Sequence, residues 1–133
     1  MKKLSIVLFV IVAFSCAKSE DNFNNDFLGK WKLTETLVGD GVSTPSWTKV
    51  SDGKAYEFLE NETFTDTKIV SSQTNCKENS YTFVNDLLTL NYFCNNKMES
   101  QIFKVKKEEN SIILTPQHIR CSEGCDYKYE KIE

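Results

Sequence analysis

The chain has 133 residues, of which 26% are charged and 40% hydrophobic, a balance typical of one globular domain and not of a disordered chain. Its net charge is −3, and removing the two lysines of the leader described below leaves 14 basic against 19 acidic residues, a net charge of −5. Arg120 is the single arginine. Because nucleic-acid phosphates are bound by clusters of basic residues, this composition argues against a nucleic-acid partner.

Residues 1–15 have the pattern of a signal peptide. Lysines at positions 2 and 3 precede the apolar run Leu4 to Phe14, which is too short to span a bilayer as a helix. The sequence Ala13-Phe14-Ser15-Cys16 resembles a bacterial lipobox, although Phe14 departs from the small or branched residue usual at its position. The resemblance implies that Cys16 is acylated and anchors the protein to a membrane. The alternative is an ordinary signal peptide followed by an incidental cysteine.

Residues 16–26 are polar, acidic and without periodicity, which predicts a flexible tether. Within it, Lys18-Ser19-Glu20-Asp21 resembles the short acidic export signal of some Bacteroidetes surface lipoproteins; the alternative is a simple acidic linker. We therefore expect a lipid-anchored protein of the outer membrane, facing the periplasm or the cell surface, with residues 27–133 as its folded domain.

Eight segments of residues 27–133 are typical of β-strands, and none has the periodicity of an amphipathic helix. In the first, Leu33 and Leu37 share the apolar face with Glu35, which either sits in a wet cavity or is turned outward by a bulge. Between two later strands, Asn85-Asp86 predicts a hairpin in which Phe83 faces Leu88 and Tyr81 faces Leu90. The expected strands are 31–38, 54–59, 63–70, 81–84, 87–93, 98–106, 111–115 and 126–132.

This pattern predicts an all-β fold, an eight-stranded antiparallel up-and-down barrel with one short N-terminal helical turn at most. Closing the sheet removes the edges that an open meander would expose. Gly29-Lys30-Trp31 resembles the Gly-x-Trp signature of the lipocalins, in the calycin superfamily, and residues 27–133 resemble the lipocalin-like domain of Bacteroidetes lipoproteins. The resemblance implies that Gly29 and Trp31 lie at the closed end, with Lys128 or Lys131 over the indole. The alternative is that Trp31 is a core aromatic of another β fold.

The lengths of the connections predict two different ends. Those at 60–62, 85–86 and 107–110 are short, whereas 39–53, 71–79, 94–97 and 116–125 are expected to be long loops. Alternate connections of a meander share an end, so short turns and Trp31 seal one end, and the other is an open mouth where binding residues gather. Trp47 and His118 lie in the long loops. Trp47 either covers the mouth as a lid or packs on the outer wall, and a solvated His118 is expected.

The cysteines at 76, 94, 121 and 125 form an even set in an exported chain, which predicts disulfides. The hairpin register places Cys76 opposite Asn95, one residue from Cys94. We therefore predict the pairs Cys76–Cys94 and Cys121–Cys125, while the other two connectivities stay open. Export argues against a zinc site, and the last pair is not a Cys-x-x-Cys motif, so no metal or cofactor is expected.

No sequence motif points to an enzyme: Gly-x-Ser-x-Gly, His-Glu-x-x-His and a phosphate-binding glycine loop are all absent. We expect a monomeric lipoprotein that binds a small apolar or amphipathic molecule at the mouth. The alternative is a protein-interaction or inhibitor module that grips a protein partner with disulfide-braced loops above a filled core. The aromatic content favours a nearly filled barrel over a roomy cavity. The expected ligand contacts are Trp47, Tyr56, Phe58, Phe64, Tyr81 and Leu90.

Overall fold

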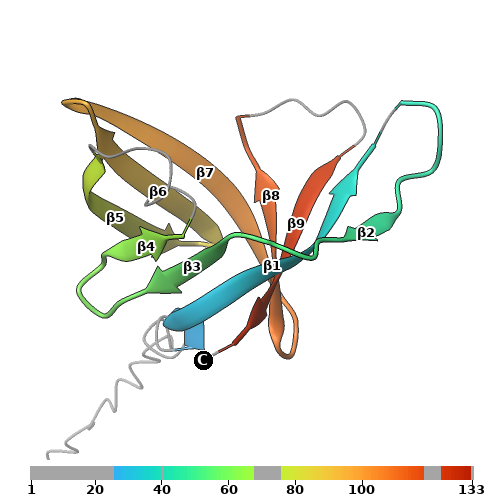
Figure 1. Ribbon diagram of the computed structural model, residues 1–133, viewed down its shortest axis with the longest axis horizontal. Coiled ribbons are helices and arrows are strands. Elements are labelled where there is room, and N and C mark those ends of the chain that lie inside the picture. The colour runs from blue at the N-terminus through green and yellow to red at the C-terminus, as the bar shows by residue number, and fades with distance from the viewer. Residues whose placement is uncertain (1–25, 40, 68–75, 119–123, 133) are drawn as a thin grey trace, which may run out of the picture.

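The computed structural model describes residues 26–39, 41–67, 76–118 and 124–132, which form one nine-stranded antiparallel sheet that curls round on itself (Figure 1). The order of strands in the sheet is β4-β3-β1-β9-β8-β7-β6-β5, and β2 also pairs with β1. The strands are β1 (Gly29–Val38), β2 (Trp47–Lys49), β3 (Ala55–Phe58), β4 (Phe64–Asp66), β5 (Cys76–Val84), β6 (Leu87–Cys94), β7 (Lys97–Lys107), β8 (Ser111–Pro116) and β9 (Cys125–Lys131). Across the described ranges, no helix has the length and apolar character needed to cross a membrane.

The two ends of the sheet meet between β4 and β5. Thr63 forms an isolated antiparallel bridge with Ser80, and the Tyr81 N–H donates to the Glu62 carbonyl at 2.8 Å. The Tyr81 phenol donates to the Leu59 carbonyl at 3.0 Å. These contacts nearly close the barrel, so the predicted all-β, eight-stranded, up-and-down architecture is confirmed. The ninth strand, β2, was not predicted.

Trp31 fills the end of the barrel where β1 begins. Its indole N–H donates to the Phe27 carbonyl at 2.8 Å, and its side chain is buried. The Phe27 ring lies against Phe58 and Phe83, with centroid distances of 4.4 and 5.3 Å. Lys131 Nζ lies 5.5 Å from the indole centroid. A basic side chain from the last strand therefore covers Trp31 as expected, and of the two candidates it is Lys131.

The predicted hairpin of β5 and β6 has the expected register, with Tyr81 opposite Leu90 and Phe83 opposite Leu88. Tyr81 and Leu90 point into the core. A bulge between Lys77 and Ser80 then shifts the pairing by one residue. The expectation that Cys76 faces Asn95 is therefore wrong: Cys76 faces Cys94. An extra residue in one strand is what such a bulge supplies.

The connection at 94–97 is not a long loop. Asn95 and Asn96 have φ values of 52° and 61°, which makes this a two-residue hairpin turn of the type that matches strand twist. Asparagine tolerates this left-handed backbone because its short polar side chain can hydrogen-bond locally. The prediction of a long mouth loop here is wrong, and β6 and β7 instead form a continuous ribbon.

Candidate functional site

A cavity lies where β7 extends beyond the end of β8. Phe103 opposite Pro116 is the last pair of the β7–β8 ladder, and from there to Lys97 the only described strand that pairs with β7 is β6 (Figure 1). The cavity has a volume of about 400 Å³. Ligand pockets commonly measure about 300–1,000 Å³, so this one suits a small molecule. Its lining consists of Leu33, Lys54, Ser100, Gln101, Ile102, Phe103, Pro116, His118, Tyr127 and Tyr129.

The β7–β8 ladder ends close to Pro116. One backbone hydrogen bond continues past this pair, because the Gln117 N–H donates to the Ile102 carbonyl at 2.8 Å. After β8, the next strand, β9, begins at Cys125. The cavity is bounded by residues of β1, β7 and β9 together with Lys54, Pro116 and His118.

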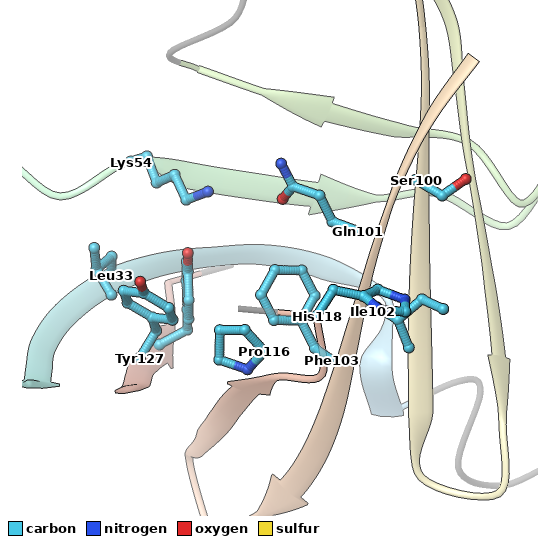
Figure 2. A pocket seen from close by; sticks show the side chains of 10 residues that line it. Leu33, Lys54, Ser100, Gln101, Ile102, Phe103, Pro116, His118 and Tyr127 are labelled. Carbon is cyan, nitrogen blue, oxygen red and sulfur yellow. The ribbon is translucent and has the colours of Figure 1, made fainter. Parts of the chain in front are cut away.

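The cavity wall combines apolar and polar side chains. Leu33, Phe103 and Tyr129 are buried core residues that also form part of its surface. Figure 2 shows Lys54 and Gln101 extending toward one another from opposite sides, above Phe103 and Pro116. An apolar surface with a few polar groups at fixed places is typical of small-molecule sites.

A chain of side-chain hydrogen bonds runs from the cavity into the core. The Lys54 ammonium donates to the Tyr56 phenol. The Tyr92 O–H donates to Asp66 Oδ2 at 3.4 Å. The Tyr56 and Tyr92 oxygens lie 3.5 Å apart, and because the Tyr92 proton is already used, the Tyr56 O–H is the donor between them. Lys54 Nζ and Asp66 Oδ2 lie 4.0 Å apart. A positive charge at the cavity is thus linked to a carboxylate that is only 3% exposed.

The phenols around this chain stay protonated. Burial raises the pKa of Tyr56 well above its ordinary value, with neighbouring Tyr129 as the next cause. Burial likewise raises the pKa of Tyr92 and of Tyr129. Removing a phenol from water disfavours its anionic form. These groups therefore act as neutral hydrogen-bonding groups near neutral pH, and not as bases.

The six predicted ligand contacts lie elsewhere. Five are buried side chains that fill the barrel, and they are Tyr56, Phe58, Phe64, Tyr81 and Leu90. Trp47 lies on β2, opposite Leu37 of β1, and is 39% exposed. None of the six is in the cavity lining given above. Of the six, Tyr56 is the one linked to residues of the cavity wall. Its ring stacks on that of Tyr129 at 5.4 Å, and its hydroxyl accepts a hydrogen bond from Lys54.

Sequence reasoning missed most of the cavity wall. Tyr127 and Tyr129 alternate along β9, so the sequence placed them on one face, but nothing there showed which strand that face would meet. Lys54 stands just before β3 and carries no local signal of its own. Its role depends on Tyr92 and Asp66, which come from β6 and β4. For Glu35 the sequence left two alternatives, and the structure has the feature that one of them required, a bulge between Leu33 and Glu35 in the pairing of β1 with β9.

Cys76 and Cys94 form a disulfide, which joins the ends of β5 and β6. Cys125 is also disulfide-bonded, whereas Cys121 and Cys16 lie outside the described residues. The pairing of Cys121 with Cys125 and the acylation of Cys16 therefore stay predictions. Among the described residues, no group of three or more His, Cys, Asp or Glu side chains is placed to hold a metal ion.

The fold defines the class of this protein as an antiparallel, nearly closed β-barrel with a cavity beside its shortened ladder. Comparisons of the chain with protein-family models, with curated proteins and with solved structures found no match. The resemblance to lipocalins consequently remains a prediction, carried by Gly29-Lys30-Trp31 and the strand pattern.

Proposed function

We propose that this protein is a membrane-anchored, extracytoplasmic lipoprotein whose lipocalin-like barrel binds a small amphipathic molecule. The observation that carries the proposal is the cavity of about 400 Å³, in which an apolar surface including Leu33 and Phe103 lies beside Lys54 and Gln101. Contact with that surface removes the apolar part of a ligand from water, which stabilises the complex by about 25 cal/mol per Å² of apolar area buried. The polar groups orient its other end.

The direction in which the chain enters the barrel supports an outward-facing site. β1 begins at Gly29, beside Trp31, and the lipidated Cys16 that we propose precedes this point by thirteen residues. Lys54 and Leu33 pair around the middle of β1, and Pro116 lies toward the opposite end of the barrel from Trp31. An anchor at Cys16 thus holds the sealed end toward the membrane and leaves the cavity in the aqueous phase.

A second candidate function, a protein-interaction module, has an observation of its own. Val38, Val42 and Trp47 are 58, 93 and 39% exposed, and they lie on or between the paired strands β1 and β2 (Figure 1). Exposed apolar residues gathered on one projecting ribbon favour contact with a protein partner. The filled aromatic core is what this alternative expects, whereas the cavity beside β7 favours the binding of a small molecule.

Native mass spectrometry of the full-length protein, purified from the membranes of its own host, tests the proposal. We expect a bound small molecule that is lost in Gln101→Trp, because the Gln101 side chain extends into the cavity toward Lys54 and the larger ring fills this space. Met98→Trp is the matched control, since Met98 lies on the same strand and is 69% exposed. A protein partner bound equally by both variants supports the interaction module. A protein recovered with neither kind of partner contradicts both.

A further inference from the structure

We propose that the cavity selects anionic ligands, and that it binds the carboxylate of a small amphiphile at Lys54. This inference rests on the proposed function, since it names the class of ligand. Of the described residues that line the cavity, Lys54 and His118 are basic and none is acidic, although the chain as a whole has a net charge of −3. The described part of the lining therefore offers an anion a positive charge at Lys54.

The position of the Lys54 ammonium suits an anion. Its side chain is 27% exposed, and its hydrogen bond to the Tyr56 phenol fixes the place of Nζ at the cavity wall. The buried Asp66 carboxylate is 4.0 Å away and is not in the lining. A charge-assisted hydrogen bond measures about 2.8 Å, so a ligand carboxylate in the cavity comes closer to Nζ than Asp66 does.

The residues behind Lys54 hold its ammonium in place. Asp66 Oδ2 lies 4.0 Å from Nζ, and the Tyr56 phenol accepts a hydrogen bond from it. Burial raises the pKa of Tyr56 and of Tyr92, so both phenols stay neutral and add no negative charge beside a ligand. A group fixed before the ligand arrives loses little freedom on binding.

The rest of the cavity fits the remainder of such a ligand. Leu33, Phe103 and Pro116 provide an apolar surface for a ring or short chain. Gln101 also lines the cavity, and its side chain extends toward Lys54 from the opposite side (Figure 2). A volume near the lower end of the usual range favours a single ring or a short chain over a long acyl chain.

Three compounds with one body and different heads test the charge preference: 4-phenylbutyrate, 4-phenylbutanol and 4-phenylbutylamine. Binding is measured by isothermal titration calorimetry to the full-length lipoprotein in phosphatidylcholine nanodiscs. We expect the acid to bind at least tenfold more tightly than the alcohol, and the amine to bind most weakly. A hydrogen bond to a charged group contributes about 1.5–3 kcal/mol, which corresponds to a factor of about ten or more.

Lys54→Met tests the assigned residue. It should weaken binding of the acid at least tenfold and change binding of the alcohol less than twofold. Lys49→Met, on the exposed strand β2, is the matched control and should change neither. Because Lys54→Met leaves Asp66 buried without this cation, the double variant Lys54→Met/Asp66→Asn repeats the measurement in a protein that lacks both charges.

The outcomes separate the two proposals. Equal affinity for acid and alcohol, abolished by Gln101→Trp, overturns the preference for anions and leaves the binding function standing. Tightest binding of the amine also overturns the preference. Unchanged affinity for the acid in both Lys54 variants overturns the role of this residue. Absence of binding for all three compounds contradicts the cavity as a binding site and with it the proposed function.

Discussion

Replacing Trp31 with alanine removes the side chain that seals one end of the barrel. The indole is only 3% exposed, and its N–H donates to the Phe27 carbonyl at 2.8 Å. Its ring lies 6.1 Å from that of Phe27 and 5.5 Å from Lys131 Nζ. Alanine leaves a cavity among these groups and a carbonyl that has lost its donor.

The expected loss is a large fraction of the total stability. Truncation of a buried Trp to Ala typically costs about 3–5 kcal/mol, which includes the cavity left behind. Domains of this size unfold with a free energy of about 5–15 kcal/mol. Each kcal/mol of lost stability lowers the melting temperature by roughly 4 °C or more, so a loss of about 3 kcal/mol lowers it by about 12 °C or more. Trp47→Ala, on an exposed strand, should cost less than about 1 kcal/mol.

Urea denaturation followed by circular dichroism measures both variants without relying on tryptophan fluorescence. We expect a lower midpoint and an unchanged slope for Trp31→Ala, because the surface exposed on unfolding changes little. Trp31→Phe keeps most of the packing and loses the indole N–H, so its midpoint should lie between those of the alanine variant and the wild type. Equal midpoints for Trp31→Ala and Trp47→Ala would refute the assignment of Trp31 as the seal of the barrel.

Two further perturbations test other contacts. Cys76→Ser/Cys94→Ser opens a disulfide between residues 18 positions apart and should cost roughly 3 kcal/mol by freeing the unfolded chain, measured as the difference in urea midpoints; a loss below about 1 kcal/mol contradicts this. The Ser111 hydroxyl and the Lys128 ammonium lower the pKa of Glu108 from 4.5, so this carboxylate stabilises the fold above pH 4.5 and ceases to do so as pH falls through its folded pKa. Glu108→Gln should therefore be less stable than the wild type at pH 7, with a smaller difference at pH 3.5, whereas a difference that grows on acidification reverses the expected sign.

The sequence determined the strands and the facing of their side chains. The alternation in β5 and β6 was enough to pair Tyr81 with Leu90, because a shift of one residue would move the apolar face into water. The turn at Asn95-Asn96 also has a local signal, since two consecutive asparagines suit the left-handed backbone of a two-residue hairpin turn. Strand β2 has no such signal: its three residues are all exposed, and only pairing with β1 makes them a strand.

Only the tertiary structure decided where the cavity lies and which groups reach it. The space beside Phe103 exists because β7 continues after β8 stops, a difference between two strands that neither strand specifies alone. Lys54, Tyr56, Asp66 and Tyr92 form one hydrogen-bonded chain because closing the barrel brings β3, β4 and β6 around a shared interior. Periodicity along a strand tells which face a residue takes, whereas the partner across the barrel depends on curvature, bulges and strand length together.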